Sequence, residues 1–451
     1  MSAIDFVSSG IKGLDDILQG LRKGDNVVWQ VDNIDDYLHF VEPFCRRAKA
    51  ESKKLIYIRF AEHRPIIEPA DNVKQYRLDA NSGFESFSKQ IHDIITREGE
   101  GAFYVFDCLS DLLSAWATDL MIGNFFMVTC PYLFKLKTVA YFAILRNNHS
   151  YKTIARIRET TQLLIDVYDF EGNFYLHPLK VWNRYSPTMY LPHQQKEDKF
   201  IPITNSVDAV RLFSYISDRG VERTERNLDY WDRLFLKAEE LARENRSQSE
   251  KTKMEEQLNR IMIGREARML SLVEHNLVLE DLLAIKSRMI GTGFIGGKAL
   301  GMLLARKILL KDKKIDWQKY LEPHDSFFIG SDVFYTYIVQ NGWWDLWSEQ
   351  KTEEGFFEKA SDLKDKLLHG TFPEEVKEQF NEMLEYFGQS PIIVRSSSLL
   401  EDGFGNAFAG KYESIFCVNQ GSPEERYANF ERTVRQVFAS TMNEDALTYR
   451  R

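Results

Sequence analysis

Short apolar runs alternate with charged, helix-like stretches over the first two hundred or so residues of the chain. The runs are roughly four to eight residues long and rich in β-branched and aromatic residues, which is typical of buried strands. The stretches between them are long enough to form the helices that connect parallel strands. The pattern therefore predicts an α/β domain with a mainly parallel sheet, whose strands lie at 26–31, 54–60, 101–109, 138–145 and 161–170.

The pattern becomes helical between residues 206 and 287. Apolar residues such as Leu234, Ala238 and Leu241 recur at helical spacing among many Glu, Lys and Arg residues. One interpretation is a connector of surface helices. The alternative is a coiled-coil arm, which would make a homodimer possible, although the polar stretch RENRSQSEKTK (243–253) interrupts the heptad pattern.

Glycine loops, short strands and helices mix from Gly291 onward, which is typical of an α+β fold. The chain thus falls into three predicted parts, residues 1–205, 206–287 and 288–451. A length of 451 residues is enough for two or three domains with sizeable cores. A hydrophobic content of 44% indicates a globular protein.

Charge and cysteine content narrow the function classes. The net charge is -9, with 67 acidic and 58 basic residues, which argues against binding to bulk nucleic acid or to an anionic membrane. The four cysteines are far apart and form no CxxC pair, so a zinc ribbon or redox dithiol is not expected. Scattered thiols suit a reducing cytoplasm.

Targeting and membrane signals are weak along the sequence. The start MSAIDFVSSG has neither a basic region nor an apolar region of a signal peptide. The most apolar window, about 112–139, is interrupted by Asp119, Asn124 and Pro131, so it falls short of a membrane span. We therefore expect a cytoplasmic protein with no membrane partner.

The stretch VSSGIKGLDDILQGLRKGDNVVWQV (7–31) resembles the start of RecA-type ATPase domains of the circadian-clock and RadA kind. The matching residues are Ser9, Gly10, Gly13, Leu14, Asp15 and Gly24. The apolar run FYVFDCLSDLL (103–113) stands where that family has its second nucleotide motif, and its strand ends in Asp107. The resemblance implies a RecA-like fold for residues 1–205.

The phosphate-binding loop of that family is missing. After the strand at 26–31 the family has G-x-x-x-x-G-K-[ST], whose backbone N–H groups and lysine hold the phosphates. Here the chain continues as DNIDDYLHFVEPF (32–44), with no glycine and no lysine. Asp32, Asp35 and Asp36 would repel a phosphate. We expect a degenerate domain that does not hydrolyse ATP, with a docking, sensing or oligomerising role and with Asp107 as a strand-end residue.

The stretch GTGFIGGKALG (291–301) raises three interpretations. A P-loop fails on spacing, because Thr292 occupies the place of its first glycine and Ala299 follows the lysine. The dinucleotide pattern G-x-G-x-x-G is matched, but a helix-like stretch precedes it where a strand is required. The third is the G-G-K segment that opens the nucleotide domain of phosphoenolpyruvate synthase and pyruvate phosphate dikinase.

A second block of sequence supports the third interpretation. PIIVRSSSLLEDGFGNAFAGKYESIFCVN (391–419) resembles that family's V-R-S-S-A-x-x-E-D…F-A-G-Q block, and VFASTMNEDALTYR (437–450) resembles its closing motif. The resemblance covers about residues 288–451. It implies an ATP-grasp-like nucleotide-binding part. Two motifs that lie about a hundred residues apart in the sequence identify this part.

The resemblance places the ATP-binding residues at Lys298, Arg395, Gly410, Ser414, Glu401 and Asp402. The chemistry suits polyphosphate. A lysine supplies a mobile point charge, an arginine can grip two phosphate oxygens, and glycines let the backbone approach closely. The family also uses Mg²⁺, whose ligands we expect mainly beyond residue 451. No histidine lies in the family's T-S-H context, so no catalytic histidine is assigned.

The family resemblance implies an N-terminal part of a phosphoenolpyruvate synthase-like (pyruvate, water dikinase-type) phosphotransferase. ATP would phosphorylate a histidine, and the group would pass to pyruvate or come from phosphoenolpyruvate, in parts that this chain lacks. This chain alone would then be catalytically incomplete. Two alternatives remain open, a non-catalytic nucleotide-sensing or scaffold protein and a phosphotransferase with another acceptor.

Overall fold

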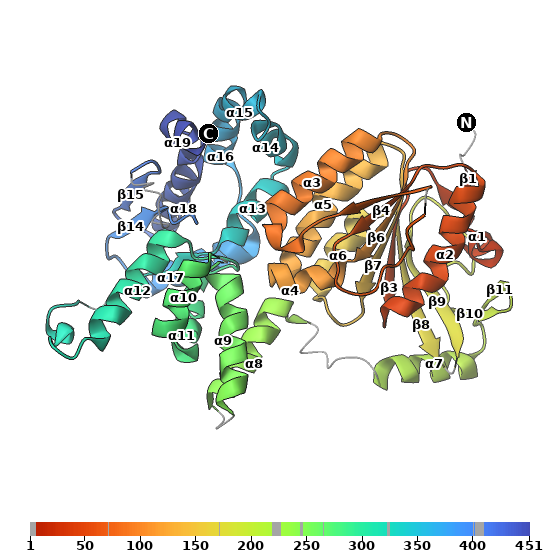
Figure 1. Ribbon diagram of the computed structural model, residues 1–451, viewed down its shortest axis with the longest axis horizontal. Coiled ribbons are helices and arrows are strands. Elements are labelled where there is room, and N and C mark those ends of the chain that lie inside the picture. The colour runs from red at the N-terminus through yellow and green to blue at the C-terminus, as the bar shows by residue number, and fades with distance from the viewer. Residues whose placement is uncertain are drawn as a thin grey trace. The chain divides into compact units, whose positions relative to one another are not determined.

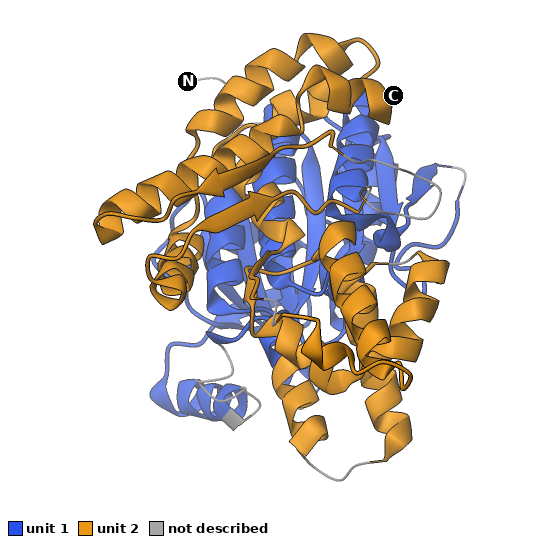
Figure 2. Ribbon diagram, turned by 90° about the vertical axis from the view of Figure 1, so that its left-hand side faces the viewer, with its two compact units in different colours: residues 1–233 blue, residues 234–451 orange. Residues whose placement is uncertain are grey.

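The computed structural model describes residues 6–70, 72–170, 172–218, 227–243, 247–264, 266–322, 325–399, 401 and 410–451. The chain divides into two compact units, residues 1–233 and 234–451 (Figure 2).

A nine-stranded sheet organises the described part of the first unit, in the order β11-β10-β9-β8-β3-β7-β6-β4-β5. Neighbouring strands from β8 to β5 are parallel, whereas β8, β9, β10 and β11 are joined by antiparallel pairs. The strands are β3 (Asn26–Val31), β4 (Leu55–Arg59), β5 (Val73–Arg77), β6 (Phe103–Cys108), β7 (Val139–Leu145), β8 (Leu163–Phe170), β9 (Asn173–Val181), β10 (His193–Lys196) and β11 (Lys199–Pro202). A separate antiparallel pair joins β1 (Phe6–Val7) to β2 (Leu21–Arg22).

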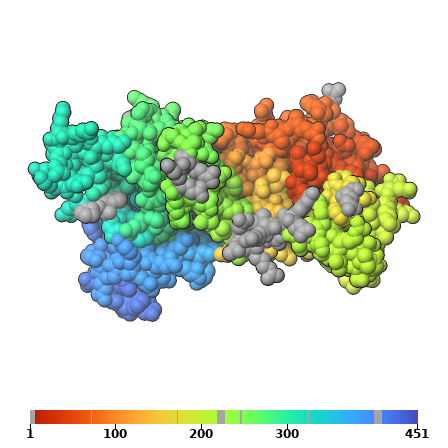
Figure 3. Space-filling view, turned by 90° about the horizontal axis from the view of Figure 1, so that it is seen from below, coloured from red at the N-terminus to blue at the C-terminus, as the bar shows by residue number. Residues whose placement is uncertain are grey.

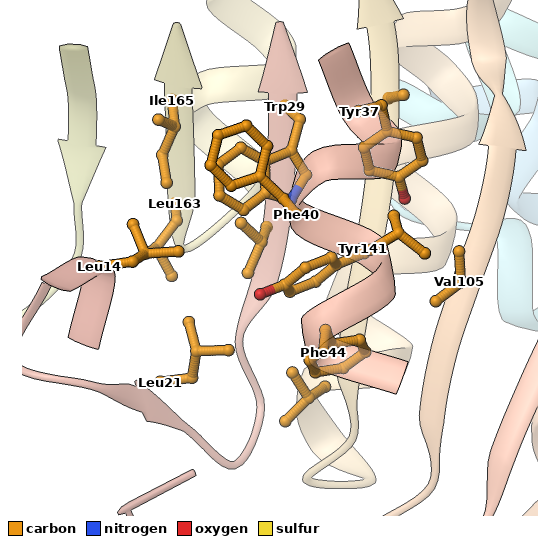
Figure 4. Packing of buried hydrophobic residues seen from close by; sticks show 14 of the residues in the cluster. Leu14, Leu21, Trp29, Tyr37, Phe40, Phe44, Val105, Tyr141, Leu163 and Ile165 are labelled. Atoms are coloured by element: carbon orange, nitrogen blue, oxygen red, sulfur yellow. The ribbon is translucent and has the colours of Figure 1, made fainter. Parts of the chain in front are cut away.

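Helices cover both faces of this sheet (Figure 1). On one face lies α2 (Ile34–Ala50), whose Phe40 ring stacks on Trp29 of β3 at 4.3 Å between ring centroids (Figure 4). On the other lie α3 (Gly83–Glu98), α5 (Asp119–Lys135) and α6 (Tyr151–Thr160). Adjacent residues of β7 show the alternation, because Tyr141 packs on α2 and Phe142 packs on α5. Shorter helical pieces are α1 (Lys12–Leu18), η1 (Ala80–Ser82), η2 (Leu109–Leu112) and α4 (Leu113–Trp116).

The most apolar stretch of the sequence forms α5. Phe125, Phe126 and Leu133 of this helix are 0% exposed, so its apolar character on all sides reflects burial within the unit. Among the described helices, none combines the length and apolar character that crossing a membrane requires.

Helix α7 (Ser206–Asp218) also belongs to the first unit, at its surface (Figures 1 and 3). The hydroxyl of Tyr215 donates a hydrogen bond of 2.6 Å to the carbonyl of Asp169, at the end of β8. The rings of Tyr215 and Phe170 lie 4.4 Å apart. This helix therefore packs against the end of β8.

The described part of the second unit is mostly helical and contains two small sheets. Strand β12 (Met289–Ile290) pairs in parallel with β13 (Phe328–Ile329), and β14 (Ile392–Arg395) pairs antiparallel with β15 (Ser414–Cys417). Helix α8 (Tyr230–Arg243) starts at the end of the first unit. The remaining elements are α9 (Gln248–Met262), α10 (Ala267–Asn276), α11 (Leu279–Lys286), α12 (Gly297–Lys311), η4 (Trp317–Lys319), α13 (Ser331–Gln340), α14 (Trp344–Gln350), α15 (Gly355–Glu358), α16 (Ala360–His369), α17 (Glu374–Phe387), α18 (Pro423–Ser440) and α19 (Glu444–Arg450).

A mixed α/β structure with a large, mostly parallel sheet and many helices is confirmed. All five strands predicted from apolar runs are present, as β3, β4, β6, β7 and β8. The antiparallel extension β9-β10-β11 was not predicted. The RecA-like and ATP-grasp-like identities, and the division into three parts, stay predictions.

Candidate functional site

The glycine-rich stretch forms a tight loop between β12 and the start of α12. Gly291, Gly293 and Gly296 all have a positive φ, at +69°, +95° and +77°, a conformation that other residues rarely adopt. A Cβ atom on Gly296 would lie 1.4 Å from the carbonyl oxygen of Ser397. Only glycine therefore allows this loop to approach the segment after β14.

That approach brings the two separate motifs of the sequence into contact. The N–H of Gly297 donates to the carbonyl of Ser398 at 3.0 Å, and the N–H of Ala299 donates to the hydroxyl of Ser397 at 3.0 Å. Ser397 in turn donates to the carbonyl of Ile295 at 2.8 Å. The serine run after β14 thus caps the first turn of α12.

Lys298 lies at this contact, and its side chain is 17% exposed. Its Nζ lies 2.7 Å from Oε1 of Glu401 and 3.3 Å from Oγ of Ser396. Glu401 is 0% exposed, and it also accepts from the Ser396 hydroxyl at 3.0 Å and from the Ser398 N–H at 2.9 Å. Two predicted site residues, Lys298 and Glu401, therefore meet as an ion pair.

Arg395 and Ser414 are directly opposite each other on β14 and β15, and both side chains are exposed. Arg395 immediately precedes Ser396, the residue that contacts Lys298, in the sequence. Gly410 is exposed, with a φ of +71° and open space around its Cα. Asp402 lies outside the described residues.

The predicted ATP-binding residues did not include the serines and the tyrosine that support this cluster, although Ser396 and Ser397 belong to the V-R-S-S motif. Tyr412 is buried, with Ser398 and Arg450 as hydrogen-bond partners, and its burial raises the pKa of its hydroxyl above the usual range. The signal in the sequence was the V-R-S-S motif with its run of three serines, since hydroxyls commonly cap a helix start.

Asp332 on α13 is a further unpredicted carboxylate beside the loop. It is 7% exposed, it accepts from the Thr292 hydroxyl at 2.9 Å and from the Ser331 hydroxyl at 3.3 Å, and burial raises its pKa to about 6. A Cβ on Gly293 would lie 2.7 Å from its Oδ1. Asp332 therefore anchors the middle of the glycine loop to α13.

The first unit has a pocket of about 420 Å³ at the carboxyl end of β3. Its lining is Asp32, Asn33, Asp36, Asp169, Phe170, Gly172 and Tyr215. Strand β3 lies between β7 and β8. The strands that follow β3 in the sequence, β4 to β7, all lie on one side of it, and the next strand, β8, lies on the opposite side. The strand order therefore reverses at β3. Open α/β sheets bind ligands at such switch points.

The groups that face this pocket are unsuited to phosphate. The backbone N–H groups of Asp35 and Asp36 donate to Asn33, and Asp36 accepts from the Asn33 N–H, which closes the start of α2 with its own side chains. Burial, together with the charges of Asp32 and Asp169, raises the pKa of Asp36. The hydrogen bonds with Asn33 act in the opposite direction, but their effect is smaller. Asp32 is paired with Arg146 at 2.7 Å, so Asp36 and Asp169 supply the remaining negative charge.

Asp107 lies in the position of the second RecA motif and is entirely buried. It forms an ion pair of 2.6 Å with Arg59 and accepts from the Tyr57 hydroxyl at 2.5 Å. The N–H groups of Phe60 and Ala61 donate to its Oδ2 at 2.9 Å each. These contacts join β6 to the end of β4, and they fit the predicted structural role.

The cluster around Lys298 fits an anionic ligand. The ammonium of Lys298 lies against the serine turn that directly follows Arg395. Ammonium, guanidinium and hydroxyl groups are donors that recognise phosphate oxygens. In the described ranges no three His, Cys, Asp or Glu side chains are placed to hold a metal ion.

Comparison with known proteins gives a match in the part of the chain that contains both motifs. A search of the curated proteins finds no match. Residues 292–451 match the family model described as pyruvate phosphate dikinase, AMP/ATP-binding domain, which confirms the family resemblance drawn from the lysine and arginine motifs.

Proposed function

We propose that the second unit binds ATP through Lys298 and Arg395, as the nucleotide-binding part of a phosphoenolpyruvate synthase-like phosphotransferase. The observation that carries this proposal is the contact of the two motifs, with Lys298 held between Glu401 and Ser396 and with Arg395 one residue away. The family match over residues 292–451 supports a nucleotide as the ligand.

The roles follow from the chemistry of phosphoryl transfer, which depends mainly on positioning the nucleotide and on screening its charge. Lys298 would contact a phosphate oxygen with its ammonium. Arg395 would hold two oxygens with its planar guanidinium, and Ser414, opposite it, would donate a hydroxyl. Mg²⁺ would screen the remaining charge. The histidine that accepts the phosphoryl group, and the pyruvate site, would belong to further domains, as in the family.

ATP binding to the full chain, measured by titration calorimetry, tests the proposal. Lys298→Met and Arg395→Met should each weaken binding by roughly 10- to 100-fold, because a hydrogen bond to a charged group contributes about 1.5–3 kcal/mol. The matched control is Lys307→Met, since Lys307 lies on the same helix and is also ion-paired, with Asp281 at 2.6 Å. Wild-type affinity in both site variants would refute the assignment.

For the first unit we propose a non-catalytic role in docking or sensing. Two features support this role. Asn33 already accepts from the N–H groups at the start of α2, where a RecA-like ATPase would hold phosphate, and the carboxylates of the pocket would repel a phosphate group. The same titration tests this, since the variant with both Lys298→Met and Arg395→Met should bind no ATP. Residual tight binding in that variant would indicate a nucleotide site in residues 1–233.

A further inference from the structure

Glu401 is the least exposed member of the Lys298 cluster. Its side chain is 0% exposed, whereas that of Lys298 is 17% exposed. Both carboxylate oxygens have partners, since Oε1 faces Lys298 and Ser396 and Oε2 accepts from the Ser398 N–H at 2.9 Å. The backbone N–H of Glu401 also donates to the carbonyl of Ser398 at 3.1 Å, which closes a turn. The carboxylate is thus held inside the turn.

This arrangement determines where the ammonium of Lys298 stands. A lysine side chain has four rotatable carbon–carbon bonds and three N–H donors. Two of those donors face Glu401 at 2.7 Å and Ser396 at 3.3 Å. The third can serve a ligand without breaking either contact, so the ion pair and a phosphate contact are compatible.

We propose that Glu401 is a positioning residue, which holds the ammonium of Lys298 for the phosphates of the nucleotide and contacts neither the nucleotide nor its Mg²⁺. The inference rests on the proposed ATP binding and assigns Glu401 a role one step removed from the ligand. A buried carboxylate with both oxygens in use suits this role better than metal ligation, for which oxygens must face the ion.

The alternative, in which Glu401 binds the metal or the nucleotide, makes different predictions. If Glu401 acts only through Lys298, its removal has no effect once Lys298 is gone. If it binds Mg²⁺, its removal weakens binding only when Mg²⁺ is present. A double-mutant cycle of Glu401 and Lys298 shows whether the two losses of ATP affinity are additive. Repeating the cycle without Mg²⁺ shows whether the effect of Glu401 depends on the metal.

The experiment measures ATP affinity of the full chain, with Mg²⁺ and with EDTA, for wild type, Glu401→Gln, Lys298→Met and the double variant. We expect Glu401→Gln to weaken binding about tenfold in both buffers, in the range seen when groups that orient a ligand-binding side chain are removed. The double variant should bind as Lys298→Met does. Circular dichroism confirms that each variant is folded.

Ser396→Ala covers the case in which Glu401→Gln does not fold. It removes only the hydroxyl that bridges Lys298 and Glu401, and it should weaken ATP binding about threefold, with no further effect in the Lys298→Met background. Additive losses, or an effect confined to Mg²⁺, would overturn the positioning role. Unchanged or tighter ATP binding by Glu401→Gln would also overturn the positioning role. If Glu401→Gln does not fold, the same result with Ser396→Ala would overturn it.

Failure of the underlying function gives a separate result. If wild type binds no ATP under either condition, the proposed function and this inference fall together. If Lys298→Met weakens binding while Glu401→Gln does not, the function stands and only the positioning role is refuted.

Discussion

The two glycines of α12 provide a sharp test of the contact that builds the site. Gly297 and Gly301 lie one turn apart on the same helix. A Cβ atom on Gly301 would meet nothing within 4 Å. On Gly297 it would lie 1.8 Å from the carbonyl oxygen of Glu401 and 3.3 Å from that of Ser398. The same added methyl group therefore meets open space at one position and backbone at the other.

The expected free energies have opposite signs. Alanine is more favourable than glycine inside a helix by about 1 kcal/mol, so Gly301→Ala should stabilise the unit by about 0.5–1 kcal/mol. At Gly297 the turn at 398–401 must move by roughly 1.5 Å to restore an ordinary contact. Overpacking of this kind costs about 1–3 kcal/mol. Gly297→Ala should therefore destabilise the contact between α12 and the turn.

Hydrogen exchange followed by mass spectrometry reports this contact locally, which global unfolding of a two-unit chain does not. In Gly297→Ala, peptides that cover residues 292–301 and 391–399 should exchange faster, and ATP affinity should fall, because Lys298 loses its fixed surroundings. In Gly301→Ala, exchange should be slower or unchanged, and ATP affinity should match that of wild type.

Two outcomes would refute the reasoning. If Gly297→Ala exchanges and binds ATP as Gly301→Ala does, α12 does not pack on the turn. If Gly301→Ala is destabilised to the same degree, the loss arises in the helix itself and the contact with Glu401 is not its cause.

Two further predictions concern buried carboxylates. Arg184→Met should cost about 3–5 kcal/mol in the first unit, because Asp25 is left buried without the partner that lies 2.9 Å away. Urea unfolding should show that the double variant Asp25→Asn/Arg184→Met recovers most of the loss, and a double variant as unstable as the single one would contradict this. For Asp332, whose folded pKa of about 6 is above the unfolded value of 3.8, the folded state binds the proton more tightly. Stability should therefore fall by about 3 kcal/mol as the pH rises from about 4 to about 6, and then stay level. Thermal unfolding of Asp332→Asn should lack this slope, and an identical slope in the variant would assign it to another group.

The parallel strands could be predicted because they are buried on both faces. β3, β4, β6 and β7 appear as continuous apolar runs, which few other elements produce. β5 (VKQYR, 73–77) was missed, since it lies at the sheet edge with exposed polar residues. β9 is half exposed, and β10 and β11 have only four residues each, so none of the three forms the continuous apolar run that marks a buried strand.

The composition of the site could be predicted better than its arrangement. Motif spacing places Lys298 and Arg395 about a hundred residues apart and says nothing of the contact between α12 and the turn that follows Arg395. The meeting of the two motifs depends on Gly296 and Gly297, which permit the loop to touch the serine turn. It also depends on the hydroxyls of Ser396 and Ser397, whose contacts the motif does not reveal. The sequence pointed to Glu401 as a nucleotide contact, and only the structure places its carboxylate beneath Lys298.

The two candidate phosphate sites, at the starts of α2 and α12, have similar backbone and capping arrangements but differ in charge. Each lies at the start of a helix, α2 or α12, whose first N–H groups are already capped by nearby side chains, by Asn33 in one case and by Ser397 in the other. A helix start alone would therefore attract little phosphate at either place. At α12 the ammonium of Lys298 lies beside the cap, and Arg395 directly precedes the capping serines in the sequence, whereas at α2 Asp36 and Asp169 face the pocket. Side-chain charge thus decides which of the two can hold a nucleotide, and it favours the second unit.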